Sequence, residues 1–120
     1  MTDYHEPWDQ LPAEVRDAHR AVISLKEELE AVDWYHQRVA LATDPDLQRI
    51  LAHNRDEEIE HACMTLEWLR RHMPGWDVRL REYLFREGDI AHEPDGSAPI
   101  TELSPPGRTL GLGSLKGQGT

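Results

Sequence analysis

Apolar residues recur between residues 15 and 39 at intervals that alternate between three and four. This spacing is the heptad pattern of a long helix that packs on its partners at a shallow angle. Pro12 precedes the series and suits a first helical turn, where its missing N–H costs nothing. One polar residue, His36, interrupts the pattern. The predicted seam consists of Val15, Ala18, Val22, Leu25, Leu29, Val32, His36 and Val39.

Two breaks then divide the helical part of the chain. At the first, Asp44 is a good N-cap and Pro45 fits the first position of a new helix. This second helix is expected to continue to about His72, because Pro74 and Gly75 both oppose its continuation. A short third helix is predicted over residues 76–86, where apolar residues again recur at helical spacing.

The very short connection between the two long helices predicts that they lie antiparallel, side by side. We therefore expect an all-α fold in which residues 11–87 form a helical hairpin with a short third helix, after a flexible lead-in at 1–10. A body of roughly 75–80 residues is marginal as a lone core. The mean hydropathy of −0.69 is also low, so oligomerisation is expected.

The composition changes from Gly88 onward, where seven of the eight glycines and four of the eight prolines lie. Residues 88–107 indicate a flexible linker. Residues 108–120 place Leu110, Leu112 and Leu115 among glycines. A short apolar stretch at the end of a flexible tether is typical of a docking peptide that binds a groove on another protein. A chance apolar cluster in a tail is the alternative.

Charge and cysteine content narrow the possible partners. The net charge of −10 disfavours nucleic acid, because phosphate binding needs clustered Lys and Arg, and it suits attraction of cations. Cys63 is the single cysteine, which excludes an internal disulfide and fits a reducing cytosol. The chain shows no signal-peptide pattern and no apolar run of membrane-spanning length. These observations predict a soluble, cytoplasmic protein.

The second helix carries a Glu-x-x-His motif, Glu58-Ile59-Glu60-His61, and the first helix carries a further carboxylate at Glu28. Di-iron carboxylate bundles need two such motifs and two further glutamates, one group from each of four helices. Glu28 and His61 lie at about the same distance from the turn near Asp44, and Glu58 lies one helical turn nearer to it, so the three are expected at one level of the hairpin. One chain therefore supplies half of the ligands of a di-iron site, and a second copy would supply the other half.

Glu28, Glu58 and His61 are each flanked by partly apolar stripes, so we expect them to face packed surface. Burying ionised carboxylates is costly unless they are paired or bind a cation. Carboxylate and imidazole ligands together suit iron, manganese or zinc. A two-fold dimer would bring four Glu and two His around two metal ions. From the residues alone, a chance Glu-x-x-His on a solvated acidic face is an equally good interpretation.

Other residues near Glu28 allow further interpretations. Glu27 and Glu30 share a face of the first helix and could hold cations, although a solvated acidic face explains them as well. Trp34 lies away from the seam, which indicates either a subunit contact or a surface aromatic. Tyr35 follows Glu28 by seven residues and could hydrogen-bond a metal ligand, or it could be an ordinary half-buried tyrosine.

Three segments closely resemble the encapsulated ferritins, the ferritin-like cargo proteins of encapsulin nanocompartments. They are Glu27-Glu-Leu-Glu-Ala-Val-Asp-Trp-Tyr35, Leu51-Ala-His-Asn-Arg-Asp-Glu-Glu58-Ile-Glu-His61 and Met64-Thr-Leu-Glu-Trp-Leu-Arg-Arg71. The resemblance covers about residues 15–87. It implies a two-helix protomer that forms a ferritin-like four-helix bundle only on dimerisation, with dimers assembled into a decameric ring.

The resemblance also implies an activity and roles for individual residues. Glu28, Glu58 and His61 match the iron ligands of a ferroxidase centre, with Glu58 bridging, and Tyr35 matches a tyrosine near that centre. Glu27, Glu30 and Trp34 match a secondary metal site on the route inward. Thr109 to Lys116, with the three leucines, resembles the peptide that docks on the encapsulin shell.

The expected function is therefore oxidation of Fe(II) to Fe(III) at a di-iron site across a dimer interface. The iron would then be mineralised and stored inside the encapsulin shell, and O2 is the expected acceptor. Two alternatives remain from the residues: a non-catalytic helical cargo or adaptor protein, and a metal-binding buffer without redox turnover.

Overall fold

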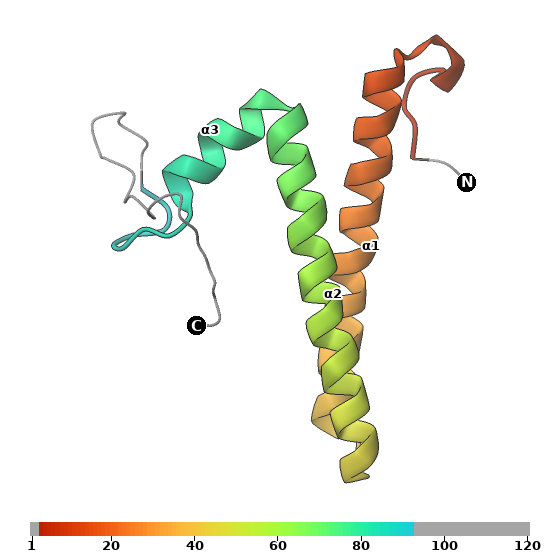
Figure 1. Ribbon diagram of the computed structural model, residues 1–120, viewed down its shortest axis with the longest axis vertical. Helices are drawn as coiled ribbons and strands as arrows, with labels where there is room; N and C mark the ends of the chain where they lie inside the picture. The colour runs from red at the N-terminus through yellow and green to blue at the C-terminus, as the bar shows by residue number, and fades with distance from the viewer. Residues whose placement is uncertain (1–2, 93–120) are drawn as a thin grey trace. The chain divides into compact units, whose positions relative to one another are not determined.

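A computed structural model describes residues 3–92, which contain four helical elements and no strand (Figure 1). They are a 3₁₀ turn η1 at Trp8–Gln10, long helices α1 at Ala13–Leu41 and α2 at Pro45–His72, and a shorter helix α3 at Pro74–Tyr83. The predicted all-α fold is confirmed. The chain divides into two units, residues 1–76 and 77–120. No helix in the described range is long and apolar enough to cross a membrane.

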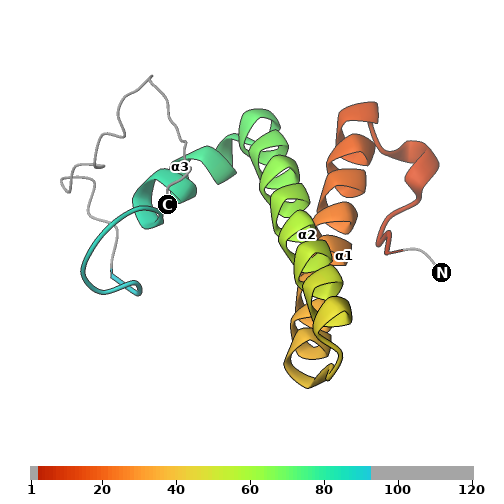
Figure 2. The same ribbon diagram turned by 60° about the horizontal axis from the view of Figure 1, so that its bottom comes forward.

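Helices α1 and α2 lie side by side and antiparallel, as both views show (Figures 1 and 2). The turn between them forms as the sequence predicts. The Asp44 carboxylate accepts a hydrogen bond from the backbone N–H of Leu47 at 2.9 Å, and Pro45 occupies the first position of α2. The side-chain amide of Gln48 donates to the carbonyl of Val39 at 3.2 Å, which links the two helices across the turn.

Two predicted boundaries shift slightly. Pro12 is the residue before α1 and not its first helical residue, because its backbone is extended, although its carbonyl accepts from Val15 and Arg16. Helix α3 begins at Pro74 and ends at Tyr83, earlier than the predicted 76–86. The proline lacks an N–H to lose, so it suits a helix start.

The row of α1 residues that packs against α2, the seam, is not quite the predicted one. One of its two columns of residues is replaced by the neighbouring column. Val15, Val22 and Leu29 are between 42% and 56% exposed. The structure buries the neighbouring column more, and it places Glu28 within the seam. The half-buried heptad series of α1 is Ala18, Ala21, Leu25, Glu28, Val32, Tyr35, Val39 and Ala42.

The prediction favoured the more hydrophobic column. Hydrophobicity alone does not say which column of α1 packs within the hairpin, and the structure turns the one that contains Ala21, Glu28, Tyr35 and Ala42 toward α2. Helix α2 contributes a matching series in which two members are charged. That series is Gln48, Leu51, Arg55, Glu58, Ala62, Thr65 and Leu69.

Little of this hairpin is fully enclosed. Among the described residues only Ala62 and Leu69 are buried, and Leu69 alone has no exposed surface. Such a core is small for two helices of 29 and 28 residues. The described residues therefore leave many large apolar side chains exposed, among them Val22, Leu29 and Trp34.

The segment before α1 folds back along that helix. The ring of Tyr4 stacks on His19 with centroids 3.8 Å apart, and Arg16 lies over the Trp8 ring at 5.3 Å. An ion pair of 3.7 Å joins Asp3 to Lys26. These contacts place the residues before α1 alongside its first half.

In the second unit, the residues after α3 turn back toward it. Phe85 and Gly88 adopt positive φ angles of 58° and 92°, and this conformation reverses the chain. The hydroxyl of Tyr83 donates to the carbonyl of His92 at 3.2 Å, and the two rings lie 4.9 Å apart.

Candidate metal centre

Glu58 and His61 lie one helical turn apart on α2 and contact each other directly. Glu58 Oε1 is 3.4 Å from His61 Nδ1. The Glu58 side chain belongs to the seam and is 27% exposed, whereas His61 lies at the seam's edge and is 45% exposed. A carboxylate and an imidazole side by side at an open edge form a pair that can bind a divalent cation from outside the hairpin.

Glu28 comes from the facing helix, and its position in the seam is unusual for a carboxylate. Its Oε1 atom is buried and has no hydrogen-bond partner among the described residues. A buried carboxylate oxygen without a donor costs free energy, and a bound cation is one of the few partners that would remove that cost. The donor set of Glu28, Glu58 and His61 therefore fits a hard or borderline divalent metal such as iron.

A single copy does not assemble a complete metal site. Within residues 3–92, no three His, Cys, Asp or Glu side chains lie close enough together to hold a metal ion. The structure brings Glu58 and His61 together and places Glu28 on the packed face of the other helix. This arrangement provides a partial set of ligands on each chain.

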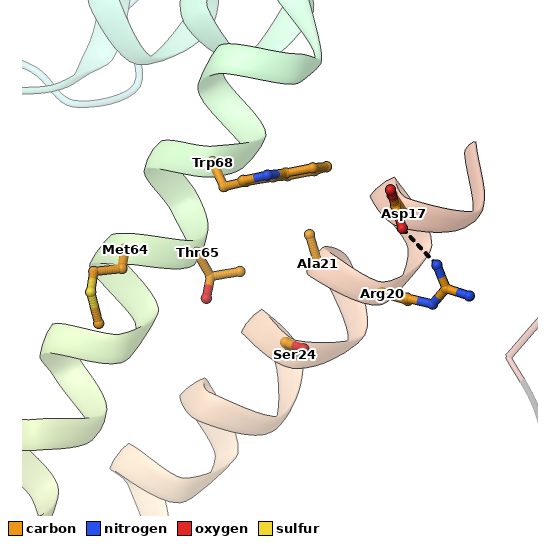
Figure 3. Close-up of a pocket in the computed structure, with 7 residues that line it drawn as sticks. All are labelled: Asp17, Arg20, Ala21, Ser24, Met64, Thr65 and Trp68. Atoms are coloured by element: carbon orange, nitrogen blue, oxygen red, sulfur yellow. Dashed lines mark hydrogen bonds and ion pairs between the residues drawn. The ribbon is translucent and has the colours of Figure 1, made fainter. Parts of the chain in front are cut away.

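An open groove of about 480 Å³ lies between α1 and α2, farther from the turn than these residues. Figure 3 shows Trp68 and Thr65 extending from α2 toward Ala21 of α1. Ala21 lies seven residues before Glu28, and Trp68 lies seven residues after His61, so each shares a helical column with a candidate ligand. The groove is also lined by Asp17, Arg20, Ser24 and Met64.

The other predicted residues lie around this centre. Glu27, Glu30 and Trp34 are all exposed on α1, outside its seam. Tyr35 is half-buried in the seam, and the guanidinium carbon of Arg38 lies 5.2 Å from its ring centroid. The predicted docking residues of the tail, Leu110, Leu112 and Leu115, lie outside the described residues, as do residues 93–107 of the predicted linker.

Two polar groups near the centre, Arg55 and His36, were not predicted from the sequence. Arg55 lies three residues before Glu58 in the α2 seam, and it contacts His36 across the hairpin. His36 had no predicted role beyond interrupting the apolar series. The sequence does contain a hint of this contact. Arg55 precedes Glu58 by three residues, which places it on the same face of α2, and His36 is the one polar residue in the predicted apolar series of α1.

The carboxylate of Glu67 on α2 is already paired with two arginines. Its oxygens accept hydrogen bonds from Arg70 at 2.8 Å and from Arg71 at 2.7 Å. The Arg70 hydrogen bond, opposed by partial burial and supported by Arg71, lowers the pKa of Glu67 to about 2. This residue is therefore an ion-pair partner and a poor candidate for a metal ligand.

Comparison with known proteins places the chain in a family. A sequence model of the EncFtn-like family matches residues 3–87. The chain is 53% identical over 123 residues to the encapsulated ferritin-like protein of Rhodospirillum rubrum. The aligned region covers 95% of this chain and 88% of the relative. It is 56% identical over 100 residues to a ferritin-like protein of Thermotoga maritima, covering 83% of this chain and 79% of that relative.

Two further relatives extend the comparison. A protein of Myxococcus xanthus named as the encapsulin nanocompartment cargo protein EncC is 28% identical over 104 residues, covering 78% of this chain and 80% of the relative. Among solved structures, protein ne0167 of Nitrosomonas europaea matches with a TM-score of 0.73 and 58% identity, over 76% of this chain and all of that one. The resemblance found in the sequence is thereby confirmed: the chain belongs to the encapsulin-associated, encapsulated ferritin-like family.

Proposed function

We propose that this protein is a ferroxidase that oxidises Fe(II) to Fe(III) at a di-iron site shared by two copies of the chain. The observation that carries the proposal is the buried Glu28 oxygen without a donor, in the same seam as Glu58, which contacts His61. These side chains give each copy two carboxylates and one imidazole. Membership of a ferritin-like family supports iron as the metal that is bound and oxidised.

Charge balance favours a two-fold arrangement of the site. Two copies related by a two-fold axis would bring four carboxylates to two divalent cations, so the negative and positive charges cancel. Glu58, at the seam, is suited to bridge the two ions, with Glu28 and His61 each bound to one. The open groove farther along the same two helices would offer part of the surface on which the second copy packs.

In this proposal the iron is the substrate, and the overall reaction is 4 Fe(II) + O2 + 4 H+ giving 4 Fe(III) + 2 H2O. Each iron gives up one electron, and one oxygen molecule takes up four. Exposed Glu27, Glu30 and Trp34 would form a secondary site that captures Fe(II) on its way inward. Half-buried Tyr35 would donate a hydrogen bond to a ligand carboxylate and fix its orientation.

The proposed role extends to an encapsulin compartment. Relatives of this chain are named as an encapsulated protein and as an encapsulin cargo protein. The leucines of residues 108–120 offer apolar anchors for a groove on the inner wall of the shell. Fe(III) released from an open ring, proposed to be a decamer, would then mineralise within the shell.

The mass of the assembly with and without Fe(II) tests the shared site. Because metal that binds only the assembled form shifts the equilibrium toward it, anaerobic Fe(II) should move the protein to larger species. Native mass spectrometry at constant protein concentration measures this shift, and air should then raise the near-ultraviolet absorbance with two irons per pair of chains. A size distribution that ignores Fe(II) would contradict the shared site, and binding without oxidation would indicate a metal buffer.

Truncation tests the docking role of the tail. Removing residues 108–120 should abolish co-purification with a co-expressed encapsulin shell and leave Fe(II) oxidation unchanged, because the candidate ligands lie in α1 and α2. A matched control lacks only residues 117–120 and keeps all three leucines, so it should load normally. Loading of the shorter chain at the full-length level, measured by gel densitometry of purified shells, would rule out this peptide as the anchor.

A further inference from the structure

A polar contact joins the two helices at the side of the proposed site that faces the turn. Arg55 of α2 lies in the seam, with its side chain 24% exposed, and its Nη1 is 3.1 Å from Nδ1 of His36 on α1. The same guanidinium donates from Nε to the Asp56 carboxylate at 3.0 Å. Arg55 is therefore held by one group from each helix.

The chemistry of the two side chains fixes the direction of the hydrogen bond. A guanidinium has only donors, so His36 Nδ1 must accept from Arg55. The His36 ring is consequently neutral in this contact, with its proton on Nε2. A residue at this position must therefore present an acceptor to keep the contact.

Arg55 would have another partner for its Nη1 end if the bond to His36 were lost, because Asp56 contacts only Nε. Arg55 precedes Glu58 by three residues, and residues three apart share a helix face and can pair. His36 lies about five residues nearer the turn than Arg55 does, or roughly 7 Å along the axis. The bond to His36 thus directs the guanidinium toward the turn and away from Glu58. Among the described residues, Glu58 instead lies 3.4 Å from His61.

We propose that His36 is a positioning residue, which holds Arg55 away from Glu58 and so keeps that carboxylate free to bind metal. The inference rests on the proposed ferroxidase site. A freed guanidinium would compete with the incoming cation for Glu58, because a carboxylate that is already paired must break that ion pair before it binds metal. His36 acts only through Arg55 and does not touch the metal.

Three variants of the full chain test this role: His36→Leu, which removes the acceptor; His36→Gln, which keeps an acceptor oxygen; and the double variant His36→Leu with Arg55→Met, which also removes the cation. The probe is Co(II), which binds such sites without being oxidised, titrated calorimetrically under nitrogen. His36→Leu should bind Co(II) about fivefold more weakly, the size expected for one partly exposed ion pair. His36→Gln and the double variant should both bind like the wild type.

Ferroxidase kinetics give a second readout. His36→Leu should raise KM for Fe(II) with kcat unchanged, because the competing guanidinium acts on binding and not on electron transfer. Circular dichroism establishes that each variant keeps its helices.

The variants together decide between the alternatives. Wild-type affinity in His36→Leu overturns the proposal, as does a loss of affinity that the double variant fails to restore, which would indicate a purely structural contact. Glu58→Gln separates this result from failure of the function itself. If Glu58→Gln binds Co(II) as the wild type does, the proposed site is wrong, whereas weak binding by Glu58→Gln with no effect of His36→Leu refutes only the positioning role.

Discussion

Replacing Glu58 and His61 together by alanine is expected to lower the rate of Fe(II) oxidation by at least about a hundredfold. Loss of groups that merely orient metal ligands already costs 10- to 100-fold in many sites, and these two side chains are the proposed ligands themselves. They also lie 3.4 Å apart and are the two candidate ligands on α2, so the double variant removes the whole α2 contribution to the site. The measurement is the initial rate of absorbance rise after Fe(II) addition in air.

The same helix offers a matched control for this variant. His53 and Glu57 also form a close pair, with His53 Nε2 3.1 Å from Glu57 Oε2, but both side chains are mostly exposed. Replacing this pair by alanine removes the same residue types from α2 and should leave the oxidation rate near that of the wild type. Equal rates in the wild type and in the variant lacking Glu58 and His61 would eliminate the assignment of the site.

Glu28→Leu should uncouple assembly from metal. In the wild type, packing a second copy over Glu28 would bury more of a carboxylate whose Oε1 already has no donor. Exchanging a buried charged group for a well-packed apolar residue is often stabilising, by about 1–4 kcal/mol. We therefore expect the metal-free variant to form more of the larger species than the wild type, and Fe(II) to change its mass distribution no further. Its oxidation rate should fall because one ligand is missing.

Glu14→Leu is the control for that experiment, because it adds a leucine to the same column of α1 at an exposed position. It should retain both the dependence of mass on Fe(II) and the oxidation rate. If Glu28→Leu still required Fe(II) to form the larger species, the buried carboxylate would not be what opposes association of the metal-free chain.

The sequence predicts the helices well, because their ends depend on local chemistry. Asp44 and Pro45 specify the start of α2 through a side-chain cap and a missing N–H, and both features appear in the structure. The rotation of α1 about its axis could not be predicted in the same way. In a hairpin that supplies half of a bundle, some apolar columns of α1 would pack against α2 and others against a second copy. Hydrophobicity does not say which column makes which contact. Val22 and Leu29 therefore looked like core and are exposed.

The candidate ligands could be found from spacing, whereas their surroundings could not. Glu28, Glu58 and His61 are recognisable because distance from the turn and helical periodicity are properties of the chain alone. The contact between Arg55 and His36 depends on two side-chain rotamers meeting across helices, and the two residues are 19 positions apart in sequence. The completed di-iron site and the bundle remain predictions, since both need a second copy.

The small extent of the buried core has a consequence for the life of the protein in a cell. With only Ala62 and Leu69 buried among the described residues, an isolated chain encloses little apolar surface and should open its helices readily. Proteases act on such opened states, so chains without a companion would be degraded faster than assembled ones. Turnover would then act as quality control, removing chains that carry an acidic, metal-attracting surface but have no complete centre.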